Sequence, residues 1–320
     1  MYRLSGFFLA FALMCSLPAR SQDYPNRPVT IVMPFPAGSV TDVLARLIAV
    51  NLQKKWGQPF IVKNQVGAAG NIGAEAVSKA PSDGYTLLLT PPPPLVTNKN
   101  LYARLGFEPE QFEPVSLIVT WPNVLLAHPK VGVNSVRELL VLAKASPNRF
   151  NYASNGSGTT PHLTGELFKS MAGVEIVHVP YKGAAPAVSD LLAGQVELAF
   201  IDLSSAVPLI RENKLRALAV AGEKRSPILP NVPTMAEVLP GFVSIAWAGM
   251  VAPPGTPSSI TTKLSAAIAE IIAQPDVAQR LVEMNVDAVG STPTEMTALM
   301  KKERERWGAV IRSTGARVDN

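Results

Sequence analysis

Two short segments near the start of the chain constrain its fold more than any other feature. Residues 29–47 and residues 60–77 each have the pattern of an apolar strand, a loop of small residues and a helix. A loop of small residues lets a ligand approach the backbone, and a helix start offers unpaired N–H groups and the positive end of the helix dipole. Because this combination suits anions, the two segments predict a receptor for a small anion.

The first 21 residues have the pattern of an export signal. Arg3 supplies the positive end, and the apolar run of residues 7–17 is too short to span a membrane. Residues 19–21 place small residues at positions −3 and −1 of a cleavage site, so we expect cleavage between Ser21 and Gln22. An uncleaved membrane anchor is the alternative.

Composition excludes several classes of function. The single cysteine of the sequence lies inside the predicted signal, so disulfides, thiol catalysis and cysteine metal sites are not expected in the mature chain. The formal net charge of +5 is small and predicts no nucleic-acid partner. A mature chain of roughly 300 residues exceeds one ordinary core and predicts two domains.

Strand and helix patterns alternate along the whole chain, which is typical of parallel α/β sheets. Four consecutive prolines at residues 91–94 argue against a helix or a central strand at that point. The predicted strands are residues 29–34, 60–64, 85–90, 151–153, 176–180, 196–201, 217–221 and 245–252. The predicted helices are residues 41–56, 73–79, 136–145, 161–171, 186–193, 206–212, 257–273, 275–285 and 293–313.

Two extended segments bracket the middle of the chain, at residues 112–128 and 245–252. They predict two crossings between a discontinuous first domain, residues 22–120 plus 240–320, and an inserted second domain, residues 121–239. The cleft between two such domains is the expected ligand site.

An ordered set of short motifs covers the whole mature chain. They are residues 24–29, 36–42, 67–74, 83–87, 154–163, 179–183, 190–196, 229–234 and 251–257. Through this set the chain resembles the periplasmic solute-binding receptors of tripartite tricarboxylate transporters, the TctC or Bug family.

The resemblance implies a two-domain periplasmic-binding-protein (Venus-flytrap) fold of the α/β class, which closes on a small organic acid, usually a carboxylate. Family members are not enzymes and deliver the ligand to membrane permease subunits, so no cofactor and no metal are expected. In the family the carboxylate is bound largely by main-chain groups and ordered water from the first two loops. We expect a periplasmic monomer. A ligand-sensing subunit of a signalling system is the alternative role.

The first and second loops carry the candidate anion site. We expect Phe35 to line the pocket and Gly38 and Ser39 to offer N–H groups; the alternative is a plain turn with Ser39 or Thr41 as the helix N-cap. Asp42 is predicted to complement the helix dipole and not to contact the ligand. The candidates are Phe35, Pro36, Gly38, Ser39 and Thr41 in the first loop and Ala68, Ala69, Gly70 and Asn71 in the second.

Two departures from the family pattern bear on the ligand. The first loop of the family commonly reads Pro-Ala-Gly-Gly, whereas Ser39 stands here at the second glycine. The third loop usually offers small polar residues, whereas this chain has the proline run, with Thr90, Pro91 and Pro92 as candidates. Because proline has no N–H, we expect one bound carboxylate followed by a less polar, aromatic or branched part. The alternative is that the prolines turn away from the cleft.

The inserted domain supplies the remaining candidates. Lys182 either pairs with a distal acid group of the ligand or is solvated, and Asp202 either binds a ligand hydroxyl or amine or caps the helix that follows it. Ser157 with His162 raises the alternative of a secreted serine hydrolase, but no nucleophile-elbow motif surrounds Ser157. The candidates are Ser154, Gly156, Ser157, Thr159, His162, Tyr181, Lys182 and Asp202.

Overall fold

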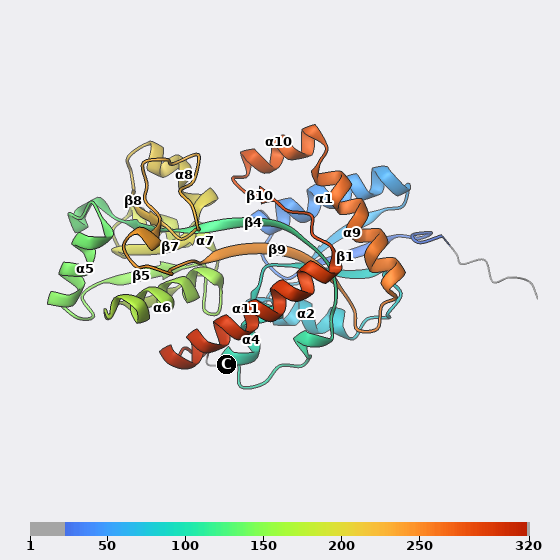
Figure 1. The fold of residues 1–320 in the computed structure, drawn as a ribbon, viewed down its shortest axis with the longest axis horizontal. Helices are drawn as coiled ribbons and strands as arrows, with labels where there is room; N and C mark the ends of the chain where they lie inside the picture. The colour runs from blue at the N-terminus through green and yellow to red at the C-terminus, as the bar shows by residue number, and fades with distance from the viewer. Residues whose placement is uncertain (1–22, 319–320) are drawn as a thin grey trace, which may run out of the picture.

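The computed structural model describes residues 23–318 (Figure 1). The signal peptide predicted over residues 1–21, with its cleavage between Ser21 and Gln22, lies outside the described residues. Within residues 23–318, no helix is both long and apolar enough to cross a membrane.

The strands are β1 (Val29–Met33), β2 (Phe60–Asn64), β3 (Thr86–Thr90), β4 (Glu113–Ala127), β5 (Asn151–Ser154), β6 (Val177–Pro180), β7 (Leu198–Asp202), β8 (Arg216–Val220), β9 (Ile245–Ala252) and β10 (Asp287–Ala288). The helices are α1 (Val40–Trp56), α2 (Asn71–Ser78), α3 (Pro93–Val96), α4 (Asn98–Leu101), α5 (Val136–Ala145), α6 (Thr160–Ala172), α7 (Ala184–Leu192), α8 (Leu203–Arg211), α9 (Ser258–Ile272), α10 (Pro275–Glu283) and α11 (Pro293–Thr314). Each predicted strand and helix is confirmed, with ends that shift by up to three residues, because loop chemistry and not periodicity sets the ends.

The sheet runs in the order β2-β1-β3-β9-β4-β7-β5-β6, with β8 and β10 also paired to β4. β1, β2 and β3 are parallel, as are β5, β6 and β7, whereas β4 and β9 pair antiparallel with each other. Two parallel α/β units are therefore joined by one antiparallel pair. We call the part around β1–β3 the first lobe and the part around β5–β8 the second lobe (Figure 1).

β4 is the long connection between the lobes. It pairs with β9 over Glu113–Pro122 and then with β7 over Asn123–Ala127. The extended segment predicted at residues 112–128 is thus a single strand that serves both lobes. The exact domain limits near residues 120 and 240 stay a prediction.

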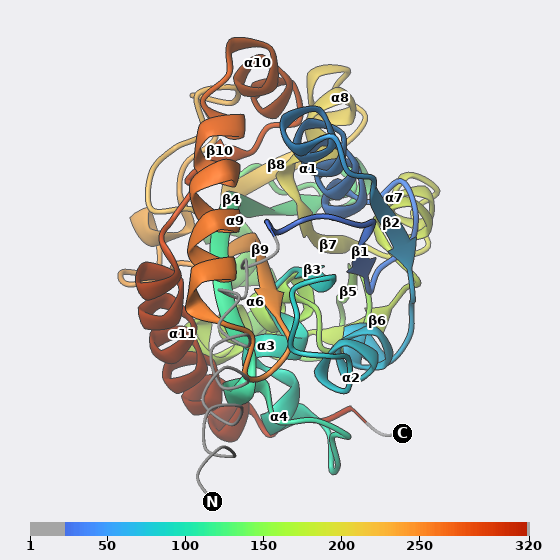
Figure 2. The ribbon, with the colours of Figure 1, turned by 90° about the vertical axis from the view of Figure 1, so that its right-hand side faces the viewer.

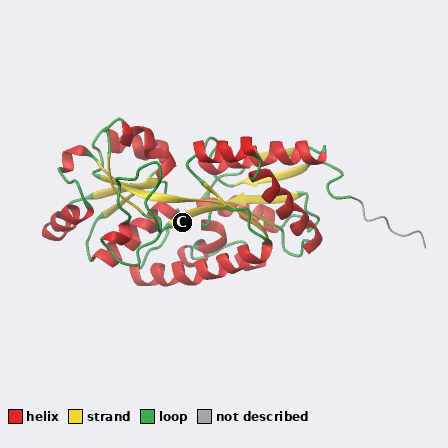
Figure 3. Ribbon diagram, turned by 45° about the horizontal axis from the view of Figure 1, so that its top comes forward, coloured by secondary structure: helices red, strands yellow, loops and turns green. Residues whose placement is uncertain are grey.

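Helices cover both faces of the sheet, and Figure 3 shows the strands running between them. One buried cluster, which includes Val29, Ile48, Trp121 and Ile268, fills the first lobe between β1–β3, α1 and α9. A second cluster fills the second lobe beneath α7 and α8. The third cluster continues from one lobe to the other, because α11 contacts β4, α3, α4 and α6. Figure 2 shows α11 beside α9 along one side of the molecule.

The proline run departs from the prediction. Pro92 is the N-cap of α3, and Pro93 and Pro94 are its first two residues. The N–H groups of the first helical turn have no intrahelical carbonyl partner, so a proline there removes no hydrogen bond. Its fixed φ also favours the helical conformation. The prediction that residues 91–94 exclude a helix was wrong for this reason.

Trp307 tests the core that α11 shares with both lobes. Its side chain is 2% exposed, and its Nε1–H donates to Glu303 Oε2 at 2.9 Å. We expect Trp307→Ala to lower the free energy of unfolding by about 3–5 kcal/mol, because it opens a cavity and removes one hydrogen bond from the buried Glu303 carboxylate. Urea titration measures the change. The half-buried Trp56 is the control, and Trp56→Ala should cost clearly less; an equal loss in the two variants would contradict the shared core.

Candidate functional site

A cavity of about 940 Å³ lies between the two lobes. The loops that follow β1, β2 and β3 form one wall, and the loops that follow β5, β6 and β7 form the other. Trp121 of β4 and Ala246 of β9, which pair with each other, line the cavity between these walls. All six loops follow the carboxyl ends of parallel strands, where α/β proteins bind ligands.

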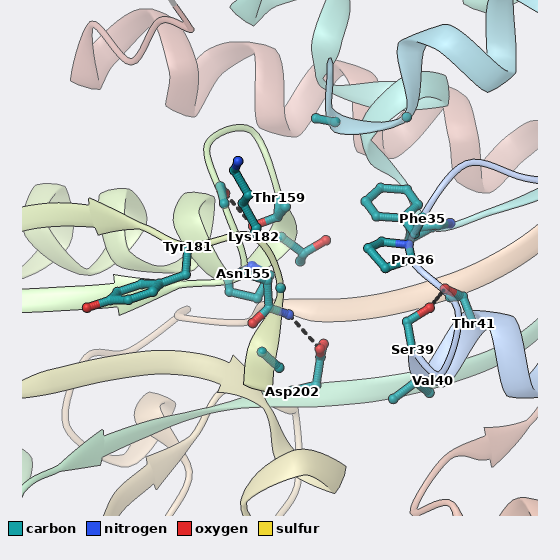
Figure 4. Close-up of a pocket in the computed structure, with 18 of the residues that line it drawn as sticks. Phe35, Pro36, Ser39, Val40, Thr41, Asn155, Thr159, Tyr181, Lys182 and Asp202 are labelled. Carbon is teal, nitrogen blue, oxygen red and sulfur yellow. Dashed lines mark hydrogen bonds between the residues drawn. The ribbon is translucent and has the colours of Figure 1, made fainter. Parts of the chain in front are cut away.

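Most of the predicted site residues line this cavity. Those on the wall are Phe35, Pro36, Gly38, Ser39, Thr41, Ala68, Ala69, Gly70, Pro91, Gly156, Ser157, Thr159, Tyr181, Lys182 and Asp202. Those that lie buried outside the lining are Asn71, Thr90, Pro92, Ser154 and His162. Figure 4 shows Phe35 and Pro36 on one wall and Asn155, Lys182 and Asp202 on the other.

The β1–α1 loop is held by Asp42. Its carboxylate accepts the Gly38 N–H at 3.0 Å, Arg46 Nε at 3.1 Å and Asn64 Nδ2 at 2.8 Å. Burial alone would raise the pKa of Asp42, but these hydrogen bonds from Arg46, Asn64 and Gly38 outweigh it and lower the pKa below its ordinary value. Asp42 is therefore an ionised brace behind the loop.

This brace changes which N–H groups a ligand can use. The Gly38 N–H is taken by Asp42, and the Ser39 N–H donates to Pro36 O at 3.3 Å. The expectation that Gly38 and Ser39 offer their N–H groups was wrong, because a side chain four residues along the helix reaches back to the loop. Ser39 is the N-cap, and its hydroxyl accepts the Asp42 N–H.

The next two N–H groups are the available ones. Val40 and Thr41 form the start of α1, where no preceding turn supplies carbonyl partners, and both line the cavity. Within residues 23–318 neither N–H makes a hydrogen bond. The positive end of the α1 dipole lies at the same place.

The β2–α2 loop has an unusual backbone. Four consecutive residues have positive φ: Gly67 (136°), Ala68 (47°), Ala69 (48°) and Gly70 (92°). An alanine in this left-handed region costs about 1–2 kcal/mol, so tertiary contacts must hold it. Asn98 supplies them, because its Nδ2 donates to Ala69 O at 3.1 Å and to Asn71 Oδ1 at 2.6 Å.

The result of this conformation is a second pair of available donors. The N–H groups of Ala68 and Ala69 make no hydrogen bond to any other described residue, and both alanines line the cavity. Strained non-glycine backbone that is held by its surroundings is characteristic of binding sites. Asn71, a predicted contact, instead acts behind the loop through Asn98.

The third loop adds an apolar surface. Pro91 and Pro93 are among the lining residues of the cavity, although Pro93 is itself buried, whereas the buried Pro92 and Pro94 are not. A Cβ atom on Gly70 would lie 3.1 Å from Phe35 Cε2 and 3.3 Å from Pro94 Cγ, so the three loops of the first lobe pack directly on one another. The proline run therefore faces both ways, with alternate rings on the wall.

On the second lobe, the β5–α6 loop rests on two stacked imidazoles. His162 Nδ1 accepts the Gly158 N–H at 3.1 Å, and its ring lies 4.1 Å from that of His178. Ser154 Oγ lies 2.7 Å from His178 Nε2 and accepts the Gly156 N–H. Burial lowers the pKa of His162 to about 4 and that of His178 to about 3, so both rings are neutral near pH 7.

These contacts give Ser154 and His162 supporting positions and bear on the hydrolase alternative. A general base for Ser157 would need a free imidazole nitrogen beside the cavity. The His162 ring lies outside the lining, and its Nδ1 already accepts a backbone N–H. The N-cap of α6 is Thr159, whose Oγ1 donates to Gly156 O at 2.7 Å.

Asp202 ends β7 and lies on the cavity wall. Its Oδ1 accepts Trp121 Nε1 at 2.6 Å, and its Oδ2 accepts Asn155 Nδ2 at 2.7 Å. Burial raises the pKa of Asp202 in spite of these hydrogen bonds. Sequence reasoning missed Trp121 and Asn155; the only signal for Asn155 was its place inside the motif at residues 154–163.

Tyr181 and Lys182 differ in how they face the cavity. The Tyr181 hydroxyl donates to Asp190 Oδ2 at 2.7 Å, and its ring points away from the first lobe (Figure 4). Burial and this hydrogen bond raise the pKa of Tyr181 to about 12. Lys182 is exposed and is the single basic side chain among the described lining residues.

Comparisons with known proteins agree with this architecture. The family model described as tripartite tricarboxylate transporter family receptor matches residues 44–316. Protein BugT of Bordetella pertussis is 38% identical over 98% of this chain and 97% of its own length. A UPF0065 protein from the tcbD-tcbE intergenic region of Pseudomonas sp. strain P51 is 39% identical over 96% of this chain and 92% of its own.

Two solved structures are similar over nearly their full lengths. R. palustris Rpa4515 with adipate has a TM-score of 0.85 and 39% identity, and the match covers 92% of this chain and 99% of that one. MatC (Rpa3494) from Rhodopseudomonas palustris with bound malate has a TM-score of 0.82 and 34% identity, and the match covers 90% of this chain and 100% of that one.

The brace at Asp42 predicts a pH-dependent loss of stability. Because the folded pKa is depressed, the ionised carboxylate stabilises the fold above its unfolded pKa, and this contribution disappears as the pH falls through the folded pKa. We expect Asp42→Asn to lower the free energy of unfolding by about 1–3 kcal/mol at pH 7 and by progressively less below pH 4. Urea titrations between pH 7 and pH 3 measure the difference. Asp287→Asn, at an exposed strand residue, should show no such gap; a pH-independent gap at Asp42 would contradict the ionised brace.

Proposed function

The chain belongs to the tripartite tricarboxylate transporter receptor family, and we propose that its interlobe cavity captures a small organic carboxylate. We propose further that it works in the periplasm as a monomer, that it passes the ligand to the membrane permease subunits of such a transporter, and that it catalyses no reaction on it.

One observation carries the carboxylate assignment. The wall of the first lobe presents four N–H groups without partners in the described chain, from Val40, Thr41, Ala68 and Ala69. No Lys or Arg from the first lobe is among the described lining residues. Hydrogen bonds from N–H groups to an ionised oxygen are stronger than those between neutral groups. A preformed cluster of backbone donors at a helix start therefore suits a carboxylate.

The relatives support the same class of ligand. Rpa4515 is solved with adipate and MatC with malate, and both are carboxylates. The apolar surface of Phe35, Pro91 and Pro93 next to the donors suits the carbon skeleton of such an acid. Ordered water can fill the space that a small ligand leaves in a cavity of about 940 Å³.

The architecture supports capture by closure. The donors belong to the first lobe, whereas Asn155, Lys182 and Asp202 belong to the second. A ligand that contacts both walls stabilises the state in which the lobes are close together, and two-lobed binding proteins close in this way. The mechanism we propose is binding to the first lobe, closure of the second lobe, docking and release.

A ligand screen tests the proposed function directly. We expect small carboxylic acids to raise the melting temperature, because a ligand at 100 times its Kd stabilises the native state by about 2.7 kcal/mol. Citrate should bind more weakly than acids with fewer carboxylates, because proline rings beside the donors leave its further oxygens unpaired. Thermal shift followed by calorimetry measures both. Absence of binding by every mono-, di- and tricarboxylate, or turnover of a bound acid or ester, would contradict the proposal.

Removal of one N–H group tests the backbone site. Val40 is the first residue of α1, and the extended Ser39 before it (φ −66°, ψ 158°) suits a following proline. We expect Val40→Pro to keep the fold and to weaken binding of the tightest acid of the screen at least tenfold, because it deletes one charge-assisted hydrogen bond.

Val40→Ala is the matched control for this test. It removes the same side chain but keeps the N–H. It should bind that acid within about threefold of the unmodified protein, a difference of about 0.7 kcal/mol or less. Calorimetry on the folded variants gives both affinities. If Val40→Pro and Val40→Ala bound the acid equally well, the Val40 N–H would not be part of the site.

A further inference from the structure

We propose that Asp202 selects the ligand by accepting a hydrogen bond from a hydroxyl or ammonium group on the bound acid. This inference rests on the proposed function and adds the substrate class: carboxylic acids that also carry such a donor.

The first support is the geometry of the carboxylate. Trp121 Nε1 and Asn155 Nδ2 each donate to a different oxygen of Asp202, at 2.6 and 2.7 Å. A carboxylate can accept about four hydrogen bonds, so each oxygen keeps capacity for another donor. Figure 4 shows the Asp202 side chain beside Asn155, on the wall that faces Ser39 and Val40. The carboxylate is therefore fixed in orientation and still able to accept.

The second support is that Asp202 does not do what an aspartate in its position normally does. It occupies the N-cap of α8, where an aspartate usually accepts an N–H from the first helical turn. Here the side chain makes no capping hydrogen bond and turns to Trp121 and Asn155 instead. The sequence left Asp202 two roles, a ligand contact or a helix cap, and the structure does not show the helix cap.

The third support is that the Asp202 carboxylate has no cationic partner among the described residues. Among residues 23–318, Asp202 forms no ion pair, and neither does the exposed Lys182. Burial also raises the pKa of Asp202, as expected for a carboxylate without a cation. A ligand group that donates would supply the further hydrogen bond that the Asp202 carboxylate can still accept.

The two walls together define an orientation for the ligand. The carboxylate lies against the N–H groups of the first lobe, and the donor group of the ligand lies against Asp202 in the second lobe. An acid of the same skeleton without that group leaves the remaining acceptor capacity of Asp202 unused after closure. Sites built to bind a hydroxyl or amine discriminate strongly against analogues that lack it.

A matched ligand series tests this inference. Succinate, malate and aspartate share one carbon skeleton and differ at one position by hydrogen, hydroxyl and ammonium. Glutarate, 2-hydroxyglutarate and glutamate repeat the comparison with one more carbon. By calorimetry with both enantiomers of each chiral acid, we expect a substituted acid to bind at least tenfold more tightly than its parent in one or both series.

The variant Asp202→Asn should remove this preference. It keeps the size of the side chain and loses the charge and one acceptor. The ratio of affinities between the substituted and the parent acid should therefore fall at least tenfold. The parent acid should bind no more weakly than to the unmodified protein. Glu197→Gln is the matched control, because Glu197 lies just before the other end of β7, accepts the Asn151 N–H at 2.9 Å, and is not a lining residue. Its ratios should be unchanged.

The outcomes separate the inference from the proposed function. Equal affinities for substituted and parent acids, or a uniform loss for all acids in Asp202→Asn, would overturn the selective role and leave carboxylate capture standing. Failure of every acid in this series and in the broader screen would overturn the proposed function itself. If Asp202→Asn does not fold, Asn155→Ala supplies the same test, since it removes a donor that orients Asp202 and should lower the same ratio.

Discussion

The antiparallel pairing of β4 with β9 is the interaction on which the rest of the structure depends. Each lobe is a parallel α/β unit that could bury its own helices, but only this pair places the carboxyl ends of both parallel sets opposite each other across one cavity. β4 continues without interruption from its partner in the first lobe to β7 in the second. The cavity is therefore a consequence of one shared pair of strands.

The two walls of that cavity are chemically unlike. The first lobe presents backbone N–H groups at Val40, Thr41, Ala68 and Ala69 beside apolar rings, and the second presents the Asp202 carboxylate and the exposed Lys182. A ligand with a carboxylate at one end and a hydrogen-bond donor elsewhere would match these two walls. The braces behind the walls, Asp42 and Asn98 in the first lobe and His162 in the second, keep each set in place before any ligand arrives.

Much of this could be predicted from the sequence, and the exceptions have physical reasons. The apolar run at residues 60–64 predicted β2 with its observed bounds, and the small-residue loops predicted segments that line the cavity. Periodicity could not show that Asp42 reaches back to Gly38, because that contact depends on a side-chain rotamer. It could not show that Ala68 and Ala69 adopt positive φ, which alanine avoids unless a partner such as Asn98 holds it. Trp121 meets Asp202 across 81 positions of sequence, so only the sheet register brings them together.

Alternation along β9 has a mechanical consequence. Successive strand residues point to opposite faces, and Ala246 lines the cavity whereas Trp247 joins the buried cluster that contains Met296 and Trp307 of α11. The cavity and α11 thus lie on opposite sides of the same two-stranded ribbon. If the lobes close as proposed, the ribbon bends toward the cavity, and α11 spans its other side through contacts with α3, α4 and α6. The contacts of α11 with elements of both lobes would then contribute to the energy of closure, although none of the residues that line the cavity lies on this helix.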